Sequence, residues 1–123
     1  MQISHLREET ESWKRYLDFI KSENVLLKSR LYCSMQDTSD LNYQARADIY
    51  RNQLAISDEM LIQLGESIDA LENLQADEAL AKPAVQKQLL ERQRTLRDEV
   101  GEFGKYYFTL RSEYNAFMTE RFV

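Results

Sequence analysis

The sequence predicts an all-α fold: an antiparallel up-down-up bundle of three long helices with coiled-coil-like heptad packing, in one domain spanning residues 1–123. The chain has 123 residues but only three glycines and one proline, too few turn residues for a many-stranded β domain. Apolar residues recur at alternating spacings of three and four residues, which is typical of helices that pack through one face. Two short breaks divide the chain, and short connections favour antiparallel neighbours. A dimer in which long helices pair between chains is the alternative.

The first helix is expected at about 3–34. Its main apolar face contains two interleaved rows with a period of seven residues, Leu6, Trp13, Ile20, Leu27 and Thr10, Leu17, Asn24, Leu31. A second stripe on the same helix consists of Phe19, Leu26 and Cys33. Because a two-stranded coil needs only one stripe, we expect this helix to pack against two neighbours.

The second helix is expected at 41–75. It follows the polar segment CSMQDTSDL, in which Ser39 or Asp40 can cap the new helix. The 3–4 spacing then resumes at Tyr43, Ala47, Tyr50, Leu54, Ser57, Leu61, Leu64, Ile68 and Leu71. Gly65 lies inside this helix at a modest cost in helix propensity.

The third helix is expected at about 84–121, because Pro83 suits the first turn of a helix and disfavours helix at the preceding residue. Its heptad positions are Leu89, Leu96, Phe103, Leu110 and Phe117, interleaved with Gln93, Val100, Tyr107, Tyr114 and Arg121. Gly101 and Gly104 are expected to let another helix approach closely, with a kink as the alternative.

Asn24 occupies a core position of the first helix. A buried asparagine at such a position lowers stability but specifies register and partner number, because its amide needs a polar partner. We therefore interpret Asn24 as a register-setting polar core residue; a ligand contact and partial exposure are the alternatives.

Chemistry-bearing residues are scarce. His5 is the only histidine and Cys33 the only cysteine. A disulfide within the chain therefore cannot form, and no second histidine is available to act as a base for the Cys33 thiol. A di-iron bundle site needs two Glu-x-x-His motifs, which this chain lacks. We expect no catalytic residue, no cofactor, no metal and no enzymatic activity.

Charge and hydropathy narrow the range of partners. The net charge of −5 argues against nucleic-acid binding, and acidic residues interrupt the basic cluster Lys87, Arg92, Arg94 and Arg97. No apolar run approaches the roughly 20 residues that span a bilayer, so we expect no membrane insertion. Without a recognisable signal peptide or cysteine pairs, a cytoplasmic location is expected.

Aromatic residues crowd the last part of the chain. An up-down-up arrangement would place them beside Tyr32, Tyr43 and Tyr50, near the 33–41 loop. Such a stripe is usually core, but aromatic residues are also enriched at protein interfaces. The candidate interface residues are Tyr106, Phe108, Phe117, Met118 and Phe122.

Two function classes remain. The first is a structural or protein-interaction bundle that acts by self-association, as a homodimer, or by binding a partner protein. The alternative is a small cytoplasmic assembly or export-type chaperone that holds an amphipathic helix of a client in an apolar groove.

Overall fold

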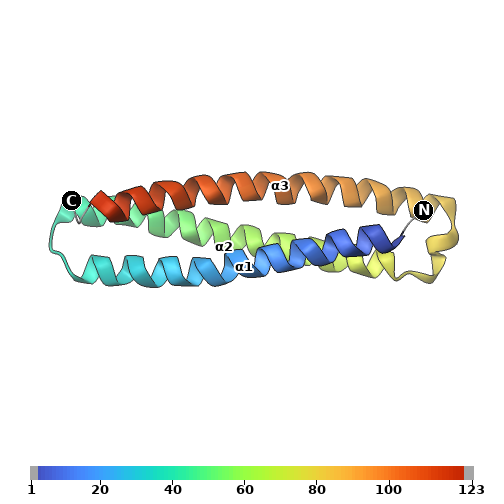
Figure 1. Cartoon of the computed structure of the whole chain (residues 1–123), viewed down its shortest axis with the longest axis horizontal. Coiled ribbons are helices and arrows are strands. Elements are labelled where there is room, and N and C mark those ends of the chain that lie inside the picture. Colours follow the sequence, from blue (N-terminus) through green and yellow to red (C-terminus); the bar gives the residue numbers. More distant parts are fainter. Residues whose placement is uncertain (1–2, 121–123) are drawn as a thin grey trace.

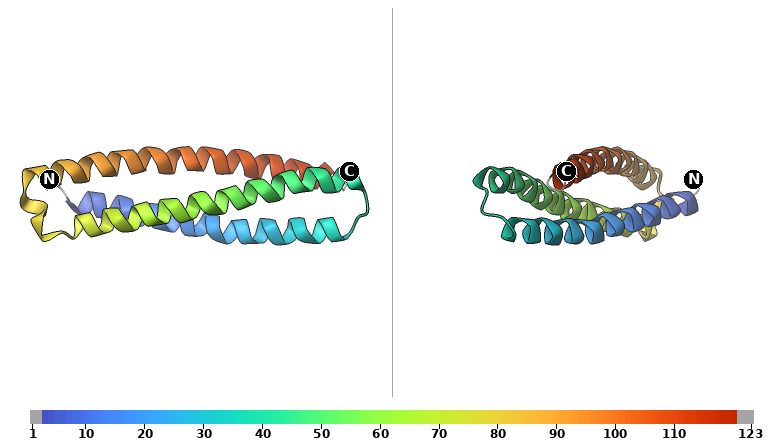
Figure 2. Two further views of the ribbon diagram at one scale, coloured as in Figure 1. Left: turned by 180° about the vertical axis from the view of Figure 1, so that it is seen from behind. Right: turned by 60° about the vertical axis from the view of Figure 1, so that its left-hand side comes forward.

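The computed structural model describes residues 3–120 and confirms the three-helix bundle. Helices α1 (Ile3–Gln36), α2 (Leu41–Gln75) and α3 (Pro83–Glu120) run up, down and up, and the short 3₁₀ helix η1 (Glu78–Ala81) connects α2 to α3. In Figure 1 the start of α1 and the end of α3 lie at opposite ends of the bundle. Figure 2 shows that the helices wind around one another at shallow angles along the whole length.

The helix boundaries follow local signals in the sequence. The Asp40 carboxylate caps α2, accepting hydrogen bonds from the backbone N–H groups of Asn42 (2.9 Å) and Tyr43 (3.4 Å). Pro83 is the first residue of α3, where its missing N–H costs no helical hydrogen bond. The helix η1 was not among the predicted elements; Asp77 caps it by accepting from the N–H of Ala79 at 2.8 Å.

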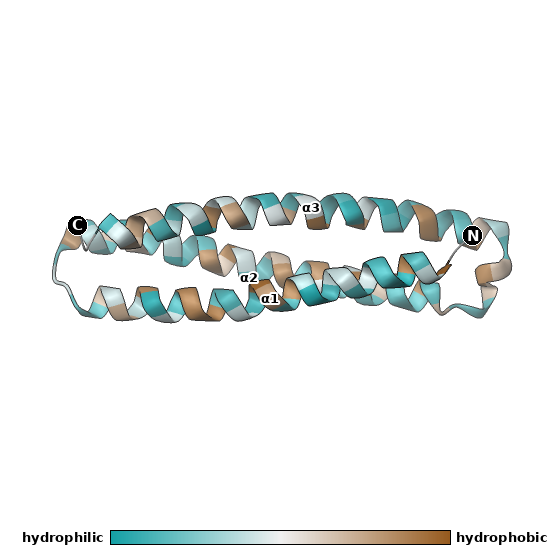
Figure 3. Cartoon of the chain, viewed as in Figure 1, coloured by the Kyte–Doolittle hydropathy of each residue, from teal (hydrophilic) through white to brown (hydrophobic). Residues whose placement is uncertain are grey.

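Hydrophobic and hydrophilic residues alternate along each helix (Figure 3), and the buried positions follow the 3–4 spacing. Buried positions within residues 3–120 include Thr10, Trp13, Leu17, Ile20, Asn24, Leu27 and Leu31 on α1, Ala47, Leu54, Ser57, Leu61, Leu64, Ile68 and Leu71 on α2, and Leu89, Gln93, Leu96, Val100, Phe103, Tyr107, Leu110, Tyr114 and Phe117 on α3. Because every helix contributes one apolar face to a shared centre, hydrophobic burial is the main stabilising term.

Tyrosines of α3 bridge the space between α3 and α1. The Tyr107 hydroxyl donates to Glu23 Oε1 at 2.5 Å, and the Tyr114 hydroxyl donates to the carbonyl of Leu27 at 2.9 Å. Their rings are buried while their hydroxyls reach polar groups of α1, which suits tyrosine's apolar body and polar tip. The α1 backbone approaches α2 more extensively than α3, so these long side chains fill the α1–α3 interface.

The end of the bundle near the 37–40 loop is aromatic. Phe117 stacks between Tyr43 and Tyr50, with ring centroids 5.0 Å apart in both pairs. Tyr50 also meets Tyr114 edge to face at 6.2 Å, and the guanidinium of Arg46 lies over the Phe117 ring. These contacts join α2 and α3, as an aromatic core stripe predicts.

The opposite end contains a buried polar layer, to which each helix contributes one residue: Thr10, Gln75 and Gln93. Gln75 Nε2 donates to Thr10 Oγ1 at 2.8 Å and to Gln93 Oε1 at 3.1 Å. Gln93 Nε2 donates to Glu9 Oε1 at 3.0 Å. Because the three side chains satisfy one another's polar groups, the layer stabilises one relative register of α1, α2 and α3.

The glycines of α3 have different surroundings from those expected. Gly104 is buried, but a Cβ at this position would overlap the hydroxyl of Tyr16, a side chain rather than the backbone of a neighbouring helix. Gly101 is exposed, and a Cβ there would meet nothing within 4 Å. The expected close helix crossing is therefore wrong: Gly104 accommodates a tyrosine tip.

We expect Tyr107→Phe to lower the free energy of unfolding by about 1 kcal/mol at neutral pH, because a buried hydrogen bond to a carboxylate is lost while Arg111 still pairs with Glu23. Burial, reinforced by Glu23, raises the pKa of Tyr107 above its ordinary value of 10.0. A raised folded pKa gives stability that is full below pH 10 and falls as the pH rises, because the unfolded tyrosine ionises first.

Urea unfolding at about pH 8 and about pH 11 measures both effects. The loss of stability on going to the higher pH should be smaller in Tyr107→Phe than in the parent. It should not vanish, because burial also raises the pKa of Tyr114, to about 12. An equal loss in the two proteins would contradict this account.

We expect Gly101→Ala to raise the free energy of unfolding by about 0.5–1 kcal/mol, the usual gain when an unstrained helical glycine is replaced. Gly104→Ala should gain less, or lose stability, because Tyr16 must move. Thermal or urea unfolding of the two single variants makes the comparison. The variant Gly104→Ala/Tyr16→Phe should recover part of the difference, and equal gains at both glycines would contradict the proposed contact.

Candidate functional site

Asn24 is fully buried between α1 and α2. Its Nδ2 donates to the carbonyl of Leu54 at 3.1 Å and to Asp58 Oδ1 at 2.6 Å. The amide therefore joins α1 to α2 at one height along the bundle, which supports the register interpretation; the role itself stays a prediction. Within residues 3–120 the Asn24 Oδ1 and Ser57 Oγ atoms are buried without hydrogen-bond partners, which lowers stability.

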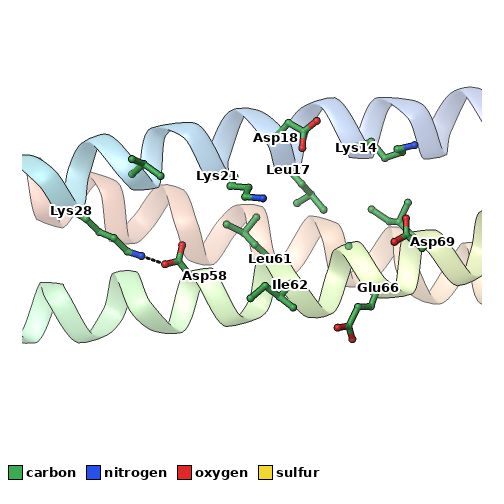
Figure 4. A pocket seen from close by; sticks show the side chains of 13 residues that line it. Lys14, Leu17, Asp18, Lys21, Lys28, Asp58, Leu61, Ile62, Glu66 and Asp69 are labelled. Atoms are coloured by element: carbon green, nitrogen blue, oxygen red, sulfur yellow. Dashed lines mark ion pairs between the residues drawn. The ribbon is translucent and has the colours of Figure 1, made fainter.

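Asp58 connects this buried amide to the surface. One carboxylate oxygen accepts from Asn24, and the other forms an ion pair with Lys28 of α1. The same two residues line one end of a groove between α1 and α2 (Figure 4). The register contact in the core and the end of the groove are therefore structurally coupled.

The groove between α1 and α2 has a volume of about 590 Å³. Buried side chains line it from below, namely Leu17, Leu61 and Ile68. Val25 of α1 and Ile62 of α2 also line it and are strongly exposed. The recess thus combines an apolar base with exposed apolar side chains and lies along two helices.

Ion pairs close the groove at both ends. Lys14 Nζ lies 3.2 Å from Glu72 Oε2 at one end, and Lys28 pairs with Asp58 at the other. The hydrogen bond that Lys14 donates to Glu72 raises the pKa of the lysine. Both pairs are partly solvent-exposed and contribute little stability, but they align the antiparallel helices.

Lys21 lies midway between these two pairs on α1, and Gly65 lies midway between them on α2. Since the helices are antiparallel, Lys21 faces the position of Gly65, where a Cβ would meet nothing within 4 Å. Within residues 3–120 Lys21 forms no ion pair, although Figure 4 shows its side chain between the helices above Leu61. The α2 position that faces Lys21 therefore has no side chain, although Glu66 and Asp69 of α2 also line the groove.

A second exposed feature, which we call the outer row, consists of Phe19, Leu26 and Cys33 of α1. The Phe19 and Leu26 side chains are 54% and 55% exposed, and Cys33 is exposed with a free thiol. The expectation that α1 uses this stripe to contact a second neighbour is wrong. Residues of α3 such as Tyr107 and Tyr114 contact α1 at other positions than this stripe.

Four of the five predicted interface residues lie in the part of the chain that the structure describes, and they differ in exposure. Phe117 is only 2% exposed and stacks inside the core, so its ring is unavailable to another molecule in this fold. Tyr106 is half-buried and its hydroxyl donates to Gln53 Oε1 at 2.7 Å. Phe108 is 40% exposed, Met118 is half-buried next to the Tyr43 hydroxyl, and Phe122 lies outside the described residues.

Other kinds of site find no support in the part of the chain that the structure describes. No group of three or more His, Cys, Asp and Glu side chains there is placed to hold a metal ion. None of the described helices combines the length and the apolar character needed to cross a membrane. Arg97, from the basic cluster, pairs with Glu9 through two 2.7 Å contacts.

Comparison with protein-family models, with curated proteins and with solved structures found no match to this chain.

We expect Asn24→Leu to raise the free energy of unfolding by about 1 kcal/mol, because it removes a buried amide whose oxygen has no partner. Asn24→Asp should lower it by several kcal/mol at neutral pH, since it places a second carboxylate beside Asp58. Urea unfolding and light scattering check both stability and mass. A clear loss of stability in Asn24→Leu, with unchanged mass, would contradict the register role.

Proposed function

We propose that the protein is a non-enzymatic protein-interaction bundle that binds a helix of another protein molecule, including a second copy of itself, against the outward side of α1. The observation that carries the proposal is that α1 keeps heptad-spaced apolar side chains outside a completed core. Phe19 and Leu26 are seven residues apart, as are Val25 and Tyr32, and all four are exposed, with Val25 also lining the groove between α1 and α2. Spacing of this kind suits contact with a further helix.

The energetic scale supports a docking surface. Burying a large apolar side chain contributes about 1.5–3 kcal/mol, and association costs at least about 4 kcal/mol in lost freedom. A partner that covers both the Phe19–Leu26 pair and the Val25–Tyr32 pair therefore gains more than one that covers a single pair. Single exposed apolar residues need no explanation, but two heptad-spaced pairs on one helix favour an interface.

The alternative, a small chaperone that holds an amphipathic helix of a client, is favoured by the groove between α1 and α2. Its apolar base of Leu17, Leu61 and Ile68 could receive the apolar face of a helix. A cytoplasmic location remains part of both proposals, and the exposed free thiol of Cys33 suits a reducing compartment.

Self-association through the outer row predicts a mass above the 14.6 kDa of one chain in light scattering across a concentration series. Phe19→Ser/Leu26→Ser should return the protein to one chain without unfolding it, because both side chains are exposed. The matched control is Ile49→Ser/Ile56→Ser, an exposed pair with the same spacing on α2, which should keep the parent mass.

A single-chain mass for the parent at every concentration would contradict self-association and leave another protein as the occupant. Loss of assembly in the α2 control alone would place the interface on α2 instead. Surface substitutions are preferable to removing the C-terminal residues after Tyr114, because such a truncation deletes the buried ring of Phe117.

A further inference from the structure

Resting on the alternative form of the proposed function, in which the groove between α1 and α2 holds an amphipathic helix, we propose that this helix belongs to a partner protein and places one carboxylate opposite Lys21. The inference concerns the chemistry of the partner rather than the existence of an interaction. It depends on three features: the shape of the groove, the unpaired Lys21, and the charges around it.

The shape of the groove favours a helix. From Lys14 to Lys28 it follows 14 residues of α1, or roughly 21 Å at 1.5 Å per residue. The backbone N–H and C=O groups of the lining segments are already bonded within α1 and α2. An extended peptide would bury unpaired backbone groups there, whereas a helix satisfies its own. A small carboxylate would leave most of the groove uncovered.

Lys21 provides the recognition element. The two neighbouring lysines on the same side of the groove pair with carboxylates of α2, but Gly65 puts no side chain at the matching position. A carboxylate from a partner would take the place of that missing side chain. Since a docked helix would exclude water from the middle of the groove, the pair would contribute more there than at an open surface.

The surrounding charges specify the rest of the partner. Asp18 of α1 and Asp69 of α2 lie toward the Lys14 end in Figure 4, and Glu66, which also lines the groove, extends below α2 in this view. Val25 and the Lys28–Asp58 pair belong to the other end. A polyanionic partner would be repelled by the two aspartates. The complementary helix therefore has apolar residues at one end, one carboxylate at its middle and basic residues at the other end.

The test uses two designed helical peptides that share an apolar row and lysines at one end. One has glutamate at the centre of the contacting face, and the other has glutamine. Titration calorimetry on the full chain should show the glutamate peptide binding one-to-one, about threefold to tenfold more tightly than the glutamine peptide. In Lys21→Gln this preference should disappear.

Gly65→Glu should weaken both peptides about tenfold or more, because its side chain fills the position opposite Lys21. The matched control is Gly101→Glu, which makes the same change at an exposed glycine of α3 outside the groove and should bind like the parent. Circular dichroism confirms that each variant is folded.

Equal affinity for the two peptides, a preference that survives Lys21→Gln, or binding unaffected by Gly65→Glu would each overturn the inference. Binding of decanoate that depends on Lys21, with no binding of either peptide, would also overturn it in favour of a small carboxylate. If the peptides bind equally and only Phe19→Ser/Leu26→Ser removes binding, the proposed function stands and this inference fails. If neither peptide binds and the parent is a single chain, both this inference and self-association through the outer row are contradicted.

Discussion

The relative register of the three helices depends most on the buried polar layer of Thr10, Gln75 and Gln93. A heptad pattern alone permits a helix to shift by seven residues while it still buries apolar side chains. Such a shift would remove the partners that the two amides find on neighbouring helices, at about 1–3 kcal/mol for each unsatisfied group. Only one register satisfies the layer, and that same register aligns Lys14 with Glu72 and Lys21 with Gly65.

Much of the fold could be predicted from the sequence because it depends on local chemistry. The 3–4 spacing identifies the core positions, Asp40 caps α2, and Pro83 begins α3. Features that depend on three-dimensional register could not be predicted. Gln75 looks like the end of a polar helix until α1 and α3 place Thr10 and Gln93 beside it. The contact of Gly104 with Tyr16 depends on the rotamer of a tyrosine one helix away.

The candidate site also combines features that local sequence predicts with features that depend on three-dimensional register. Counting aromatic residues drew attention to the C-terminal end of the chain, but most of those rings are needed inside the bundle because they fill its wide α1–α3 and α2–α3 interfaces. The groove had a signal in the sequence, the seven-residue spacing of Lys14, Lys21 and Lys28. That signal has meaning only when the opposing residues of α2 are known, since two lysines have carboxylate partners and the third faces a glycine.

The up-down-up arrangement of the three long helices has a mechanical consequence. Ile3 and Glu120 lie at opposite ends of the bundle, so tension between them acts along the helix axes (Figure 1). The tension would pull α1 and α3 past each other in opposite directions. The contacts between the helices would then bear the force along their whole length at the same time. In a two-helix hairpin pulled from its open end, contacts break one after another instead. The bundle would therefore be loaded in shear. The hydrogen bonds that the hydroxyls of Tyr107 and Tyr114 donate from α3 to α1 would resist this sliding.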